Sequence, residues 1–443
     1  MSEPLLAGFA VREITPPLGV TMAGFAARKG GATGVHDSLY TQAMVLNKDS
    51  RWVAVISMDL VEASDFLVNR VRQAVSTKTE IPADAILVGS THNHSGPLIS
   101  GRFGEFENQE VVDMIATATI EAVLEAVQNL RPVRMKVGSA SVPDVAKNRR
   151  SLEPSPDPEV NFIGFYADRR LIGCLVNFPL HATVLGAENR QYTADYPGYL
   201  RRTIQEKYPD CCIVFLNGAA GNINIGYSAD ASALGEVFDF RTFAKAAEVG
   251  GKLGSAVING LGTAEWVDSV AIEARECHVP LPLKELPSTK ELKQKITQST
   301  QKIEELRAAG APIADISKAE VGKIYLECLQ DAMLRRGIEG QRELAMPVQA
   351  LRIGPAILVA IPGELFVELG LAIRQSQQNL HVFLVGYANG SWGYLPNRNA
   401  FGQGGYEVET SIFNENMGEA LVDSASQLVR SLVSDGGENC GGI

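Results

Sequence analysis

The chain has 443 residues, of which 45% are hydrophobic, and it is therefore long enough and apolar enough to bury a large core. Its formal net charge of −11 argues against a nucleic-acid-binding surface, which needs clustered Lys and Arg side chains. No uninterrupted apolar run approaches the roughly 20 residues that a membrane-spanning helix requires. We therefore expect a globular protein without a transmembrane segment that acts on a small molecule and binds no nucleic acid.

The cysteines and the N-terminus bear on the cellular compartment. The six cysteines show no CxxC spacing, and most lie inside apolar runs, where free thiols pack as small hydrophobic groups. The segment Met1–Gly8 has neither the basic region nor the long apolar run of a secretory signal. Both features favour the reducing cytoplasm. The oligomeric state is left open, with a homo-oligomer as one alternative.

Up to about residue 280, short β-rich runs alternate with helical stretches. The expected strands are 53–58, 86–89, 160–166, 171–178 and 211–216, and the expected helices are 65–76, 109–130 and 194–207. In the helix over 109–130, apolar residues recur at intervals of three and four. This alternation predicts a mixed α/β fold in which layered β-sheets are flanked by helices.

Between about residues 283 and 340 the composition shifts to Lys, Glu, Gln and Ala, with a break at Gly310–Pro312. This predicts a helical hairpin inserted between strands, whose charges form a solvated face or, alternatively, bind a partner. Strand-like runs resume at 346–353, 356–361 and 382–386, and a last helix is expected over 415–432. We expect residues 1–435 to form a single domain and residues 436–443 to be a disordered tail.

The segment Ile86–Pro97 is an apolar run that ends in His92 and His94 and leaves through Ser-Gly-Pro. Two residues with a single residue between them point to the same side of an extended backbone. Imidazole is a common ligand of zinc and other late first-row metals, although a single histidine at a strand end is more often a hydrogen-bonded structural residue. His181 closes the apolar run 171–178 in the same way. The pair, with its small neighbours, therefore indicates a metal site.

Three further loops follow apolar runs. Glu364 comes after a Pro-Gly turn and is a candidate ligand or general base, or alternatively a carboxylate favoured by the dipole of a helix over 365–374. The segments 388–396 and 402–407 are too rich in Gly, Asn and aromatic residues for a regular element, which is typical of functional loops. The Gly-rich loop 217–224 lacks the lysine or the glycine spacing of a nucleotide site.

Four of these motifs, in this order and at this wide spacing, resemble the catalytic domain of the neutral, non-lysosomal ceramidases. They are Ser90–Pro97, Asn177–Thr183, Pro362–Glu364 and Gly405–Glu407. The resemblance implies one zinc ion per chain, held by His92, His181, Glu364 and Tyr406. It also implies that His94 contacts the reacting carbonyl oxygen and that Arg149 lies on the substrate side.

The chain departs from the family pattern at two places in its sequence. Asn222 stands where the family has a serine beside the zinc ion. After the tyrosine motif only a helix and a tail follow, whereas the family continues with an immunoglobulin-like domain. Together with the expected cytoplasmic location, these departures favour a substrate that is smaller or more polar than ceramide.

The activity implied by the resemblance is attack of a zinc-activated water on an amide carbonyl, with Glu364 or the water itself handling the proton. Two alternatives stay open at this point. The first is metal-dependent hydrolysis of an ester, a lactone or a sugar-derived substrate. The second is a metal-stabilised binding protein without catalytic activity.

Overall fold

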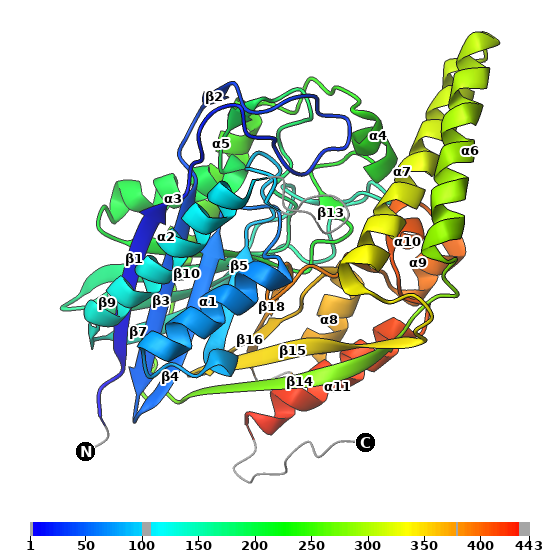
Figure 1. The fold of residues 1–443 in the computed structure, drawn as a ribbon. Helices are drawn as coiled ribbons and strands as arrows, with labels where there is room; N and C mark the ends of the chain where they lie inside the picture. Colours follow the sequence, from blue (N-terminus) through cyan, green and yellow to red (C-terminus); the bar gives the residue numbers. More distant parts are fainter. Residues whose placement is uncertain (1–2, 100–107, 378–379, 434–443) are drawn as a thin grey trace.

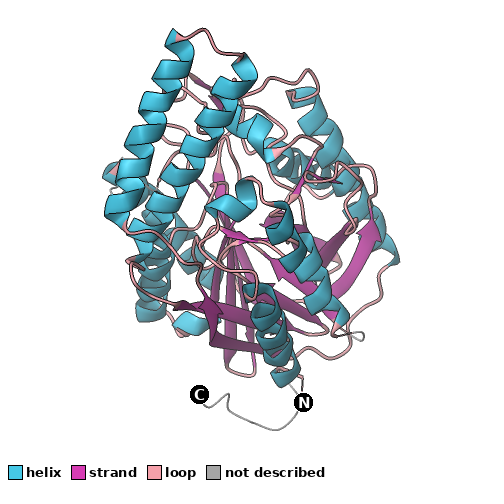
Figure 2. Ribbon diagram, turned by 90° about the vertical axis from the view of Figure 1, so that its right-hand side faces the viewer, coloured by secondary structure: helices cyan, strands magenta, loops and turns pink. Residues whose placement is uncertain are grey.

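Three larger β-sheets, with helices on their outer sides, form the centre of the described part of the chain, and three two-stranded sheets accompany them (Figure 2). The computed structural model describes residues 3–99, 108–377 and 380–433. Within them the mixed α/β class expected from the sequence is confirmed. The tail expected at 436–443 lies outside the described residues. No helix in the described part of the chain combines the length and the apolar character needed to cross a bilayer.

The first sheet has the strand order β5-β4-β3-β1-β6. Its strands are β1 (Leu6–Glu13), β3 (Tyr40–Lys48), β4 (Arg51–Met58), β5 (Ile86–Ser90) and β6 (Arg131–Pro132). β4 and β5 run parallel, whereas the other pairs are antiparallel. Helices α1 (Asp65–Lys78) and α2 (Gln109–Gln128) cover this sheet, and their buried residues Val71 and Ile115 share a cluster with Ile56 of β4 (Figure 1).

The second sheet has the order β12-β10-β9-β7 and lies against a pair of helices. The strands are β7 (Arg134–Ser141), β9 (Glu159–Ala167), β10 (Arg170–Phe178) and β12 (Cys212–Asn217), and the helices are α3 (Asp195–Lys207) and α5 (Phe243–Thr263). A Cβ atom at Gly250 of α5 would lie 2.5 Å from the carbonyl oxygen of Tyr196, so glycine permits the close approach of the two helices. Because glycine has a low helix propensity, the sequence pattern did not predict α5.

The third sheet has the order β14-β15-β16-β18 and carries the inserted hairpin. Its strands are β14 (Ile272–Pro282), β15 (Glu343–Ile353), β16 (Ala356–Ala360) and β18 (His381–Val385), with helices α8 (Val367–Gln375) and α11 (Met417–Ser431) packed beside it. Pro282 pairs with Glu343, so the last residue of β14 lies beside the first residue of β15. From this end α6 (Thr289–Ala308) and α7 (Ile313–Arg336) project away from the sheets (Figure 1).

Short elements occupy the loops around the strand ends. They are β2 (Gly34–Val35), β8 (Lys147–Asn148), β11 (Gln191–Tyr192), β13 (Ile223–Asn224), β17 (Glu364–Leu365), β19 (Tyr394–Leu395), α4 (Ala229–Leu234), α9 (Arg398–Gln403), α10 (Tyr406–Thr410) and a 3₁₀ turn at Ala83–Ala85. The segments 388–396 and 402–407 therefore hold regular elements that their composition did not predict. Two-residue strands are too short to leave a periodic pattern.

The inner faces of the three sheets pack against one another. Val55 of β4, Leu175 of β10 and Leu358 of β16 belong to a single buried cluster. In each sheet one neighbouring pair runs parallel, namely β4 with β5, β10 with β12 and β16 with β18. The carboxyl ends of parallel strands meet at one edge of a sheet, which is where sites form in α/β folds.

Two buried asparagines join these strand ends. The side-chain amide of Asn217 donates to the carbonyl oxygens of Thr91 (3.1 Å) and Leu180 (2.9 Å), and its oxygen accepts from the Leu180 N–H (3.2 Å). Asn177 donates to the carbonyl oxygens of Leu216 (3.1 Å) and Leu384 (2.9 Å). Backbone from all three sheets is thereby held in one place.

We expect Asn217→Ala to lower the free energy of unfolding by about 2–4 kcal/mol, because it leaves three buried backbone groups without their partner. Asn129→Ala is the matched control, since Asn129 is exposed and donates one bond to Phe9. It should cost less than about 1 kcal/mol. Urea denaturation measures both values, and equal losses would contradict this role of Asn217.

Candidate metal centre

His92 follows β5 and has its ring fixed by the backbone. Its φ of 58° places it in the left-handed region, so the backbone is not extended as the sequence argument assumed. The ring nitrogen Nδ1 lies 2.7 Å from the carbonyl oxygen of Val61, which only accepts, so Nδ1 carries the hydrogen. Nε2 is therefore the unprotonated nitrogen available as a ligand.

His181 follows β10 and is held in the same way. Its Nδ1 lies 2.6 Å from the carbonyl oxygen of Ala220 and 3.1 Å from that of Ile223. Both oxygens belong to the segment that follows β12, so these hydrogen bonds join the segment to the His181 ring. The Nε2 atom again faces the centre of the site, 3.2 Å from Oε2 of Glu364.

Glu364 begins β17, which pairs in parallel with β19, so that Glu364 lies opposite Tyr394. Its Oε2 lies 3.5 Å from Nε2 of His92. That oxygen is buried and has no hydrogen-bond partner among the described residues. The alternative role at a helix N-terminus falls to Glu368, because α8 starts only at Val367. Glu364 is thus a buried carboxylate directed at two imidazoles.

His94 completes a group of three imidazoles. Its Nε2 lies 3.0 Å from Nε2 of His92, and its buried Nδ1 has no partner among the described residues. One nitrogen from each of His92, His94 and His181 lies within 4.8 Å of the others. A Cβ atom at Gly24 would lie 2.4 Å from the His94 ring, so only glycine allows this backbone to pass.

The electrostatics of the group favour neutral imidazoles. Burial lowers the pKa of His92 to about 3 and places the pKa values of His94 and His181 well below the ordinary value. Burial also raises the pKa of Glu364, opposed by His92 and Arg149. Neutral imidazole is the form that binds a metal ion, so the three rings are ready to act as ligands at neutral pH.

Arg149 brings a positive charge to the edge of the group. Its Nη1 lies 3.3 Å from Nε2 of His181, and its Nη2 donates to the Tyr394 hydroxyl at 3.1 Å. Its Nε donates to Glu407 at 2.7 Å, and Arg150 donates to the other oxygen of Glu407 at 2.8 Å. Arg149 is therefore at the site, as the sequence predicts, and its orientation is fixed by a carboxylate.

Two tyrosines lie on this side of the site. The Tyr394 hydroxyl bonds both Arg149 and Glu364. The Tyr406 ring packs 5.6 Å from that of Tyr394, and its hydroxyl lies 3.9 Å from Sγ of Cys328 in α7. The role of Tyr406 as a ligand stays a prediction. Of the two phenols, Tyr394 has the direct contact with the candidate ligand Glu364.

Asn222 is close to the site, but its side chain is engaged elsewhere. Its amide donates to Glu368 at 2.9 Å, and its side-chain oxygen accepts from the Val367 N–H at 3.0 Å. Its carbonyl oxygen accepts from the backbone N–H of Arg149 at 2.8 Å. A direct catalytic role for Asn222 stays a prediction, whereas the observed contacts fix the start of α8.

The sequence reasoning missed Tyr387 and assigned no role to Tyr394. Tyr387 stacks on His92 with ring centroids 4.0 Å apart and places its hydroxyl 3.5 Å from Nδ1 of His181. Tyr394 lies inside the segment 388–396, whose composition did indicate a functional loop. Tyr387 lies one residue before it, at the end of an apolar run, and carried no separate signal.

The donor set fits a transition metal ion such as zinc. Three neutral imidazoles and a carboxylate are common zinc ligands, and Glu364 Oε2 is a buried oxygen whose hydrogen-bonding capacity is unused by the described residues. The two Nδ1 hydrogen bonds to backbone carbonyls are the support that metal-bound histidines usually have. The arrangement can therefore hold a cation next to Arg149 and Tyr394.

Comparison with known proteins finds similarity to ceramidases. Residues 5–210 match the family model "Neutral/alkaline non-lysosomal ceramidase, N-terminal". A neutral ceramidase of Oryza sativa subsp. japonica is 23% identical over 231 residues, which are 46% of this chain and 29% of that protein. The match thus spans less than a third of the rice protein.

Solved structures extend the similarity in fold. The neutral ceramidase from Pseudomonas aeruginosa superposes with a TM-score of 0.75 over 97% of this chain and 74% of that one, at 18% identity. A ceramidase complexed with C2 gives a TM-score of 0.74 over 97% and 75%, also at 18% identity. The resemblance to the neutral/alkaline non-lysosomal ceramidases is thereby confirmed in sequence over residues 5–210, and in fold over nearly the whole chain.

Proposed function

We propose that the chain is a zinc-dependent hydrolase that cleaves the C–N bond of an amide in a small or polar substrate. The observation that carries this proposal is the convergence of His92 Nε2, His181 Nε2 and Glu364 Oε2, with separations of 3.5 Å and 3.2 Å from the carboxylate oxygen. The ceramidase relatives favour a hydrolase.

Each candidate residue has a role that its contacts allow. A zinc ion bound by His92, His181 and Glu364 would lower the pKa of a water molecule and polarise a carbonyl group. If Oε2 of Glu364 binds the ion, the other oxygen of the same carboxylate could accept a proton. His94 is neutral and carries one N–H, which suits it to donate to a developing oxyanion.

The proposed substrate class rests on the space beside these groups. Among the described residues, a cavity of about 80 Å³ adjoins His92 and Glu364, and Glu62, Ser391 and Trp392 also line it. Pockets for drug-sized ligands have volumes of roughly 300–1,000 Å³. A short group with polar atoms fits this space, which supports a small or polar substrate.

The cytoplasm is the proposed location. The five cysteines within the described residues are all free thiols, and Cys174, Cys211 and Cys212 are buried. Free thiols persist in a reducing compartment, which supports this location.

We expect elemental analysis of the purified protein to find one zinc ion per chain. His92→Ala and His181→Ala should each lose most of it, because each removes one fixed imidazole ligand. His381→Ala is the control, since His381 is exposed at the start of β18. Circular dichroism would verify that the variants fold. Retention of metal in both site variants would refute the proposed ligand set.

The activity is tested with short N-acyl amines beside the matching ethyl esters and lactones. We expect turnover of the amides, loss of turnover after dialysis against a chelator, and recovery on addition of zinc. Chelator-resistant turnover would exclude the metal mechanism. Turnover confined to esters or lactones would exclude the amide assignment while leaving the metal site intact.

Two variants compare the contributions of Tyr394 and Tyr406 to zinc binding. We expect Tyr394→Phe to weaken zinc binding by about tenfold or more, because its hydroxyl contacts Glu364, a size of effect typical of groups that support or contact metal ligands. Tyr406→Phe should change zinc binding less, since the Tyr406 hydroxyl lies beside Cys328. Competition with a zinc-binding dye measures both. A larger loss in Tyr406→Phe would support the ligand role that the sequence resemblance implies for Tyr406.

A further inference from the structure

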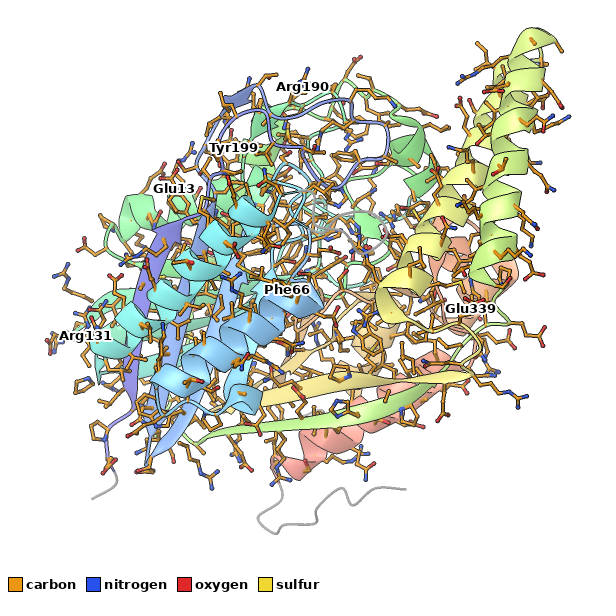
Figure 3. All side chains as sticks on the ribbon, viewed as in Figure 1. Glu13, Phe66, Arg131, Arg190, Tyr199 and Glu339 are labelled. Atoms are coloured by element: carbon orange, nitrogen blue, oxygen red, sulfur yellow. The ribbon has the colours of Figure 1, made fainter. Side chains whose placement is uncertain are left out.

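The inserted hairpin reaches back to the site at the C-terminal end of α7. Arg335 pairs with Glu62 at 3.0 Å, and Arg336 pairs with Asp65, the first residue of α1, at 2.8 Å. The side chains of Arg335 and Glu62 are 27% and 18% exposed, and that of Arg336 is 12% exposed, whereas its partner Asp65 is 47% exposed. The Arg335–Glu62 pair is therefore the one in which both partners are mostly buried. Figure 3 labels Phe66, the residue that follows Asp65 at the start of α1.

Arg336 also contacts the loop after β18 directly, and Arg335 is connected to it through Glu62. Arg336 donates to the carbonyl oxygen of Ser391, and its guanidinium lies 3.9 Å from the centroid of the Trp392 ring. The Trp392 indole N–H donates to Asp65 at 3.2 Å, and the Ser391 hydroxyl donates to Glu62. Both acidic partners of the arginines are thus bonded to the loop as well, which makes one connected polar network.

This network coincides with the wall of the cavity beside the candidate metal ligands. Glu62, Ser391 and Trp392 line the cavity together with His92 and Glu364. The third arginine of the hairpin helices has a different partner. Arg307, near the tip, pairs with Glu320 of the neighbouring helix. The contacts of α7 with the cavity wall are therefore a local feature of its last turn.

We propose that Arg335 and Arg336 are specificity-determining residues that limit the size of the substrate group accepted beside His92 and Glu364. They do so by holding Glu62, Ser391 and Trp392, which line the cavity, in place. This inference rests on the proposed function, because it concerns the substrate of the same site. The two arginines thereby favour substrates whose acyl or amine group in this cavity is short, and they disfavour substrates with a long alkyl chain there.

The test compares two hydroxamates that bind zinc through the same head group, acetohydroxamate and octanohydroxamate, on the zinc-loaded protein. In the wild type we expect acetohydroxamate to bind more tightly. In the double variant Arg335→Met, Arg336→Met we expect the affinity ratio to shift by about tenfold or more towards octanohydroxamate, the scale of a pocket that admits added methylene groups. Arg307→Met is the matched control and should keep the wild-type ratio.

A second readout needs no metal. Trp392 is 7% exposed, and acrylamide quenching of its fluorescence reports how accessible its indole ring is to solvent. Subtracting the signal of the corresponding Trp392→Phe protein isolates Trp392 from Trp52 and Trp266. We expect stronger quenching in the double variant and no change in Arg307→Met. Glu62→Gln weakens the same network at the partner of Arg335, and it should shift both readouts in the same direction. It replaces the double variant if that protein does not fold.

The outcomes separate the two proposals. An unchanged hydroxamate ratio, or an unchanged quenching of Trp392, in the double variant and in Glu62→Gln would overturn the specificity role. A wild-type protein that binds neither hydroxamate would overturn the proposed function and the specificity role with it. That failure is distinguishable, because acetohydroxamate is small enough for the cavity and would then fail in every variant alike.

Discussion

The site depends on hydrogen bonds between imidazole rings and backbone carbonyl oxygens. A carbonyl oxygen only accepts, so the bonds to Val61 and Ala220 require the hydrogen on Nδ1 of His92 and His181 and leave both Nε2 lone pairs facing the centre. Those two carbonyls belong to loops that follow β4 and β12. The state of the imidazoles is therefore set by loop packing, which Asn217 maintains through its bonds to Thr91 and Leu180.

The charges around the site are balanced in a way that permits a cation. Arg149 lies within 3.3 Å of His181, and its unneutralised charge would repel a metal ion. Glu407 offsets this charge by bonding Arg149 and Arg150 together. Burial acts to raise the pKa of Glu407, but the two arginines outweigh it, and the net pKa is lowered. Glu407 thus stays ionised, and Glu364 remains available to the centre.

The parts of the site that were predictable from the sequence are local. His92, His181 and Glu364 each follow an apolar run within a few residues. Such a pattern can be recognised from one short stretch of sequence, without knowing which other segments lie nearby. The contact between Glu364 and Tyr394 depends instead on the register of two very short strands, 30 positions apart in the chain. Even the histidine pair converges for a reason other than the expected one, because a left-handed residue, not an extended strand, directs His92.

Asn222, at the position where the resemblance implies a serine in the family, uses its side chain for contacts with α8. A serine hydroxyl has one hydrogen and a shorter reach, whereas the Asn222 carboxamide donates to Glu368 and accepts from the Val367 N–H at the same time. The start of α8, which has no capping side chain of its own, is thereby bonded to the loop after β12. Because the Asn222 carbonyl also accepts from the N–H of Arg149, this geometry favours a residue that positions the arginine over one that contacts the substrate.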